Sequence, residues 1–219
     1  MVGDLFAEAF EEKPGSAHLR VRVILTISGV FALGIIPGFT LLLGSYGSPL
    51  TTSLSAIGNS PGMRTAYLTW AIVLCAYYVA ALYALSILTG DRLKRLRVVA
   101  WLIAGALLGS SVIPFYPDEM PGWAFAHEIG SKLSAGFLVL AFLLFTLSIR
   151  ISYPRLFRRA LVLLVVIVAA AGIPYLFFSA SWISTGPGLI GAGLFLFLTM
   201  FWLVREDDFD PEAVFSTKS

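Results

Sequence analysis

The stretch ALVLLVVIVAAAGIPYLFFSA, Ala160–Ala180, decides the fold of this chain. It contains no charged side chain, and a helix needs about 20 such apolar residues to cross the roughly 30 Å hydrocarbon core of a bilayer. Three arginines stand just before it, at positions 155, 158 and 159. An uncharged run of this length that begins behind a basic segment is typical of a transmembrane helix.

The composition of the whole chain agrees with this interpretation. Of its 219 residues, 58% are hydrophobic and only 13% are charged, whereas about 25% of the residues of a soluble domain are charged. So few charges could not cover the apolar surface of a water-soluble fold. Lipid must therefore be part of the solvent, and the length suffices for one compact bundle.

Five further stretches are apolar and long enough, or nearly so, to cross a membrane. They are Val23–Leu43, Ala66–Thr89, Val98–Phe115, Leu133–Ile149 with a polar extension before it, and Ile183–Val204. Their runs are continuous, without the alternation of a membrane strand, which favours helices over a barrel. We expect an all-α polytopic membrane bundle of six transmembrane helices within residues 23–204. Residues 1–22 form a cytoplasmic segment, and residues 205–219 form a flexible, acidic cytoplasmic tail.

Lysine and arginine are distributed unevenly among the connections. Thirteen of the 15 basic residues fall in the terminal segments, in the loop 90–97 or in the loop 150–159, and only Arg64 and Lys132 lie elsewhere. Loops rich in lysine and arginine stay in the cytoplasm. The pattern predicts that both termini are cytoplasmic and that the protein is a multi-pass protein of the cell membrane.

Cysteine and histidine are too few for a metal site. The chain has the single cysteine Cys75, in an apolar run, and two histidines, His18 and His127, in distant segments. We therefore predict no metal site and no cofactor. The expected partners are membrane lipids and no nucleic acid, while a homo-oligomer or another membrane partner stays open.

An Ile-Pro pair occurs late in each helix that is expected to run outward. The pairs are Ile36-Pro37, Ile113-Pro114 and Ile173-Pro174. Proline lacks a backbone donor and clashes with the preceding turn, so each pair is predicted to bend the outer half of its helix. Coincidence is the alternative, because proline is common in membrane helices.

Polar residues that are not topology signals gather at the predicted outer face. The long loop 44–65 is expected to fold back over the bundle, and the helix entry at 127–134 carries further polar groups. At about 1.5 Å per residue from Ile149, Lys132 lies about 25 Å and His127 about 33 Å away, near the outer interface. Glu128 and Lys132 are four residues apart and can form an ion pair. The candidate ligand-binding residues are Ser55, Asn59, Asp118, His127, Glu128 and Lys132.

Three functions are compatible with this outer cluster. The leading hypothesis is a non-enzymatic protein that binds a lipid or small amphiphile in an outer polar cleft. An alternative is a membrane-embedded hydrolase for lipid headgroups that uses Ser55, Asp118 and His127, although no nucleophile-elbow motif surrounds Ser55. A small transporter is the third, disfavoured because no helix carries an ionisable residue near mid-span.

Three outer motifs resemble a membrane family known as domain of unknown function 998. Ser53-Leu-Ser-Ala-Ile-Gly58 is similar to its Ser-x-Leu-Gly loop, with Ile57 in place of the usual leucine. Ile113-Pro-Phe-Tyr-Pro-Asp118 is similar to its Phe-Pro-x-Asp element, with Tyr116 inserted. The helix of His127, followed by Ala135 and Phe137, resembles its His-x-x-x-Ala…Phe entry. The pattern is also similar to DRAM-like and Sfk-like membrane proteins, and it implies six helices with an outer polar cluster and no settled activity.

Overall fold

The computed structural model describes residues 16–89, 94–116, 118–178, 181–206 and 209–216. Six helices in this part of the chain are long and apolar enough to cross a membrane, and the described residues contain no strand. The predicted all-α bundle with six spanning helices is therefore confirmed. Residues 1–15, 90–93 and 217–219, to which several expectations refer, lie outside the described residues.

The first spanning helix is built from three consecutive segments, and the other five are single helices. The three segments are α2 (Ser16–Val30), the π-helical η1 (Phe31–Ile35) and α3 (Ile36–Gly44). The others are α5 (Arg64–Leu88), α6 (Lys94–Val112), α7 (Pro121–Ser148), α8 (Pro154–Phe178) and α9 (Trp182–Val204). Two short helices, α4 (Leu54–Asn59) and α10 (Pro211–Ser216), lie outside the spans.

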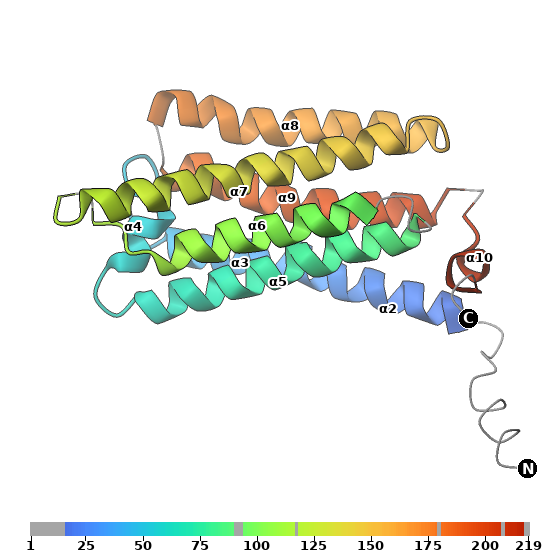
Figure 1. Cartoon of the computed structure of the whole chain (residues 1–219), viewed down its shortest axis with the longest axis horizontal. Coiled ribbons are helices and arrows are strands. Elements are labelled where there is room, and N and C mark those ends of the chain that lie inside the picture. The colour runs from blue at the N-terminus through green and yellow to red at the C-terminus, as the bar shows by residue number, and fades with distance from the viewer. Residues whose placement is uncertain (1–15, 90–93, 117, 179–180, 207–208, 217–219) are drawn as a thin grey trace, which may run out of the picture.

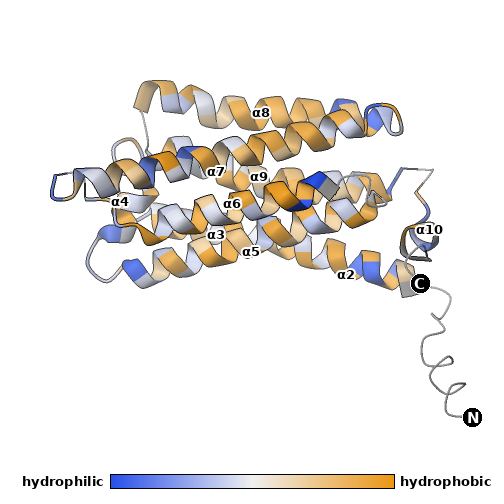
Figure 2. Ribbon diagram, viewed as in Figure 1, coloured by the Kyte–Doolittle hydropathy of each residue, from blue (hydrophilic) through white to orange (hydrophobic). Residues whose placement is uncertain are grey.

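The spanning helices lie lengthwise beside one another, and their connections alternate between two ends (Figure 1). The end at which α2 begins and α9 finishes also holds the connection 149–153 and the start of α8 with its three arginines, and we call it the basic end. The opposite end holds α4 and the connections α6–α7 and α8–α9, and we call it the hydroxyl-rich end. Figure 2 shows hydrophobic residues along the lengths of the helices and hydrophilic residues near both ends.

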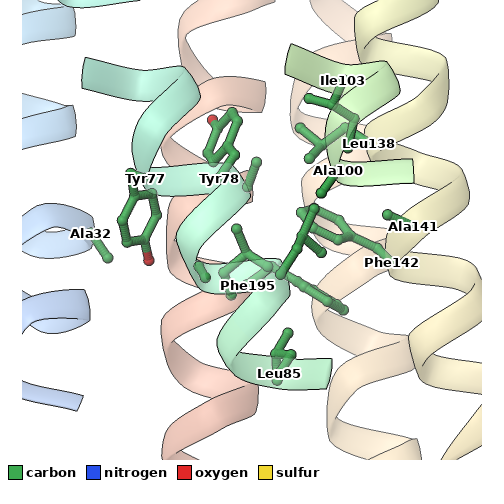
Figure 3. Packing of buried hydrophobic residues seen from close by; sticks show 14 of the residues in the cluster. Ala32, Tyr77, Tyr78, Leu85, Ala100, Ile103, Leu138, Ala141, Phe142 and Phe195 are labelled. Atoms are coloured by element: carbon green, nitrogen blue, oxygen red, sulfur yellow. The ribbon is translucent and has the colours of Figure 1, made fainter. Parts of the chain in front are cut away.

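Helix α9 occupies the centre of the bundle, in contact with the first span, α5 and α8. Its Phe195 is fully buried, with its ring stacked on Phe142 of α7 at 4.1 Å and edge-on to Phe145 at 6.4 Å. Tyr77 and Tyr78 of α5 lie on the other side of the same core (Figure 3). Aromatic packing of this kind holds membrane helices together, because lipid leaves little hydrophobic force between them.

Helix α8 lies at the edge of the bundle and packs chiefly against α9. Only 6% of its most apolar 18-residue window is buried, and Leu176 is 82% exposed. An apolar helix exposed to water in this way would be strongly unfavourable, since about 25 cal/mol is lost per Å² of apolar surface left in water. The exposed face of α8 is therefore a lipid-facing surface.

The three Ile-Pro pairs have different structural roles. The π turn η1 comes just before Pro37, and the Ile36 amide donates to the carbonyl of Phe31, five residues back; this wide turn accommodates a residue that cannot donate. Pro174 lies inside α8. The predicted bend at Pro114 is wrong, because α6 has already ended at Val112. A residue before proline disfavours helical geometry, so the pair ends the helix.

Hydroxyl groups near mid-span are hydrogen-bonded between helices. The Tyr77 hydroxyl donates to the Gly193 carbonyl at 3.1 Å and lies 3.0 Å from the Ser28 hydroxyl. The Tyr78 hydroxyl donates to the Leu189 carbonyl at 2.7 Å. These bonds tie α5 to α9 and to the first span. Satisfying polar groups inside the protein is what a bilayer requires, since lipid offers no partners.

Candidate functional site

The end of α6, at the hydroxyl-rich end, is where side chains from several segments meet. The last carbonyls of a helix have no partner within it, and Pro114 supplies no amide to cap them. Three side chains donate instead to carbonyls at this helix end or in the segment 113–115 that follows it. They are Asn59, Arg64 and His127, which we call the α6-exit clamp.

His127 reaches the helix end from α7. Its Nδ1 lies 2.7 Å from the carbonyl oxygen of Ser110 and 3.1 Å from that of Ile113, so the hydrogen on Nδ1 is donated to them. The ring packs against that of Phe115 at 5.2 Å, and the residue is only 4% exposed. In this position the imidazole holds α7 to the end of α6.

Asn59 and Arg64 reach the same segment from α4 and α5. The Asn59 amide donates to the Phe115 carbonyl at 3.1 Å, while Arg64 donates to the Asn59 side-chain oxygen at 3.2 Å and to the Val112 carbonyl at 2.6 Å. A guanidinium at the C-terminal end of a helix also offsets the negative end of the helix dipole. The clamp thus joins α4, α5, α6 and α7.

Ser55 belongs to a different part of the hydroxyl-rich end. Its hydroxyl lies 3.1 Å from that of Ser53, which caps α4 by accepting from the Ala56 amide. The loop around α4 folds back over the bundle as predicted, because the amides of Trp182 and Ile183 donate to carbonyls of that loop, at 3.0 and 3.1 Å. This loop covers the start of α9.

The remaining predicted residues lie on the surface. Asp118 is exposed in the turn before α7. Lys132 donates to Glu128 at 2.7 Å, with the two side chains 59% and 48% exposed, so the predicted ion pair is present at the surface. Among the six candidates, the structure brings Asn59 and His127 to one helix end. That all six form one cleft stays a prediction.

A shallow, wide-open groove of about 690 Å³ lies at the basic end, along the surface of α8 and beside Trp202 of α9. We call it the arginine groove. Seven residues line it: Arg155, Arg158, Arg159, Val162, Leu163, Val166 and Trp202. None of the six residues predicted for the outer cleft is among them. In the sequence these arginines were interpreted only as topology signals, and the helix face that they share with valines was not recognised.

The spacing of these residues explains the shape of the arginine groove. Positions 155, 158, 159, 162, 163 and 166 each have a partner three or four residues away within the set, so they lie on one face of α8. The three arginines lie at the N-terminal end of that face, and the aliphatic side chains of Val162, Leu163 and Val166 lie further along it. The groove thus changes from charged to apolar along its length.

Two contacts fix Arg159 at the wall of the groove. Its guanidinium carbon lies 5.9 Å from the centre of the Trp202 ring, and its Nη1 lies 4.0 Å from a carboxylate oxygen of Glu206. The Glu206 side chain is only 15% exposed. An arginine above an aromatic face keeps its N–H donors, which lie in the plane of the guanidinium, available to an anion.

A second groove, of about 590 Å³, lies between the first span, α5 and α6. Its floor contains Ala76, Ala80 and Ala84, a stripe of small residues on α5, and its wall includes Trp101. The lining consists almost wholly of apolar atoms. It can accept hydrocarbon, and the lining holds no charged side chain.

Comparison with protein-family models, with curated proteins and with solved structures gave no match. The resemblance to domain of unknown function 998 therefore stays a prediction that rests on the three short motifs. In the part of the chain that the structure describes, no three histidine, cysteine or acidic side chains gather closely enough to hold a metal ion.

Proposed function

We propose that this multi-pass membrane protein holds a membrane lipid or similar amphiphile in the arginine groove and acts as a lipid-binding protein rather than an enzyme. The observation that carries the proposal is the change from guanidinium groups to aliphatic side chains along one face of α8. An amphiphile has the same change along its own length. Binding sites for small molecules combine an apolar lining with a few oriented polar groups in this way.

The depth of the residues supports this function. At about 1.5 Å per residue, Val166 lies about 10 Å further along α8 than Arg159. A headgroup held by the arginines would stay at the level of the interface, while its chain lies along Val162 and Val166. Trp202 faces the groove from the end of α9, where aromatic side chains commonly mark the membrane interface.

The orientation of the bundle is part of the proposal. The basic residues that flank the spans cluster at the basic end, whereas the hydroxyl-rich end holds Arg64 and Lys132. By the positive-inside rule, the basic end faces the cytoplasm of the cell membrane. The arginine groove then opens to the cytoplasmic leaflet rather than to the outer leaflet.

The outer-cleft and hydrolase hypotheses have less support from the contacts. The polar atoms of Asn59 are bonded to Arg64 and to the Phe115 carbonyl, and the Nδ1 of His127 is bonded to the end of α6. The Ser55 hydroxyl is paired with that of Ser53. A nucleophilic serine needs a base within hydrogen-bond reach. The hydroxyl of Ser55 contacts Ser53, whereas the Nδ1 of His127 contacts the Ser110 carbonyl, so the two side chains have different partners. Membership of the family named above is likewise a proposal.

Filling the apolar part of the groove tests this function. Val162 and Val166 are 64% and 56% exposed, so Val162→Trp together with Val166→Trp should fold while occupying the space for a chain. Native mass spectrometry of the purified full-length protein should show retained phosphatidylcholine for the wild type and much less for this variant. The control Val165→Trp changes an equally exposed valine of α8 outside the lining and should retain the lipid. Equal retention by all three proteins would contradict the proposal.

A further inference from the structure

We infer that the arginine groove selects an anionic phospholipid, whose phosphate is bound by Arg155, Arg158 and Arg159 at the basic end. This inference rests on the proposed function and specifies its lipid class. The arginine side chains are exposed at the mouth of the groove, so a headgroup can reach them without displacing the helices. A guanidinium binds a phosphate through two parallel hydrogen bonds, which an ammonium cannot do.

The charge of the rim favours an anion. Among the described residues at the rim, the positive charges of Arg158 and Arg159 exceed the single negative charge of Glu206 opposite Arg159. Phosphatidylcholine would bring its own cation next to this surface, whereas phosphatidylglycerol brings only the phosphate. Basic pockets between membrane helices on the cytoplasmic side are sites for anionic headgroups for this reason.

The aliphatic wall distinguishes a phospholipid from free phosphate. Val162, Leu163 and Val166 continue directly from the arginines along α8. A soluble phosphate would gain nothing from this wall, whereas an acyl chain can lie against it while its headgroup stays at the rim. We therefore assign the groove to one phospholipid molecule of the leaflet that the basic end faces.

Glu206 sets how strong the preference is. Its carboxylate is mostly buried and 4.0 Å from Arg159, so it offsets part of the positive charge that a headgroup would meet. Replacing it with glutamine keeps the shape and removes the charge. Glu206→Gln should therefore tighten the binding of an anionic lipid, in the direction opposite to that of the arginine variants.

The test compares phosphatidylglycerol with phosphatidylcholine of the same chains, each titrated into the purified full-length protein and followed by native mass spectrometry. A basic residue near an anionic lipid contributes about 1 kcal/mol to the binding free energy, which corresponds to about fivefold in affinity. The variant R155Q/R158Q/R159Q should lose about 100-fold of its affinity for phosphatidylglycerol and change little toward phosphatidylcholine. The matched control R95Q/R150Q/R205Q removes three charges at the basic end outside the groove lining and should keep the preference.

The outcomes separate the inference from the proposed function. A wild type that holds both lipids equally, or a control that loses the preference as fully as the groove variant, overturns the anionic assignment while lipid binding stands. A wild type that holds neither lipid overturns both. Weaker phosphatidylglycerol binding in Glu206→Gln, or displacement of the lipid by soluble glycerol phosphate, also contradicts the assignment.

Discussion

His127 offers a sharp test of whether the hydroxyl-rich end is held by a structural clamp. His127→Phe keeps a ring of similar size against Phe115 but removes the donor to the carbonyls of Ser110 and Ile113. A polar group left buried without its partner costs about 1–3 kcal/mol. The unfolding equilibrium should therefore shift by about five- to 150-fold toward the unfolded state.

The single cysteine provides the assay. Cys75 is buried in α5, so a thiol-reactive dye labels it as the protein unfolds in mixed micelles. His127→Asn should recover much of the loss, because an asparagine amide can place a donor close to the position of Nδ1. Glu128→Gln changes an exposed neighbour and serves as the control. His127→Phe as stable as the wild type would refute the structural role.

Three further predictions concern the packing and the topology. Gly58→Ala should cost about 1–3 kcal/mol, because its new methyl group would lie 2.3 Å from the Cγ of Tyr67, whereas Gly105→Ala meets nothing within 4 Å and should be neutral by the same dye assay. In a double-mutant cycle of Tyr77→Phe with Ser28→Ala, the coupling energy between the two hydroxyls should be about 0.6 kcal/mol and at most about 1.7 kcal/mol, the range for hydrogen bonds between membrane helices; a larger coupling would contradict this. With Cys75 replaced by alanine, single cysteines at the hydroxyl-rich end should react with an impermeant reagent from outside sealed cells, and protection would reverse the proposed orientation. The positions are Ser48 and Asp118, both of which are exposed.

The sequence was sufficient for the six spans because length and apolarity decide them. An uncharged run such as Ala160–Ala180 has no favourable state outside lipid, whatever its neighbours are. The helix ends were less well predicted, since they depend on caps rather than on hydropathy. Helix α7 begins at Pro121, well before the predicted apolar stretch from Leu133, because proline is favourable in a first helical turn.

The tail shows a similar dependence on local contacts. It was expected to be flexible, and within it the structure places α10, at Pro211–Ser216, in contact with α2. An aspartate side chain, Asp210, accepts from the Glu212 amide at the start of this helix, at 2.9 Å. Composition alone does not reveal such a cap.

The candidate site was harder to predict because neighbouring helices decide the role of a polar residue. His127 and Asn59 were interpreted as ligand-binding. His127 instead donates to the carbonyl of Ser110 in α6, 17 residues earlier in the chain, and Asn59 donates to that of Phe115, just after α6. Arg64 was the residue in the sequence that could have indicated this structural role. It is one of the two basic residues at the hydroxyl-rich end, and a basic residue that departs from the positive-inside rule often has a local partner. The arginine groove was not predicted for the opposite reason. Its arginines obey the positive-inside rule, and this rule alone accounted for their positions.

The central claim is that a lipid lies along α8 with its headgroup at the basic end. The most direct measurement is a crystal structure grown in a lipidic mesophase that contains phosphatidylglycerol with brominated chains. Anomalous bromine peaks along Val162 and Val166, with headgroup density beside Arg155, Arg158 and Arg159, are the predicted result. Bromine peaks confined to the groove between the first span, α5 and α6, with no lipid density at the arginine groove, would contradict the account.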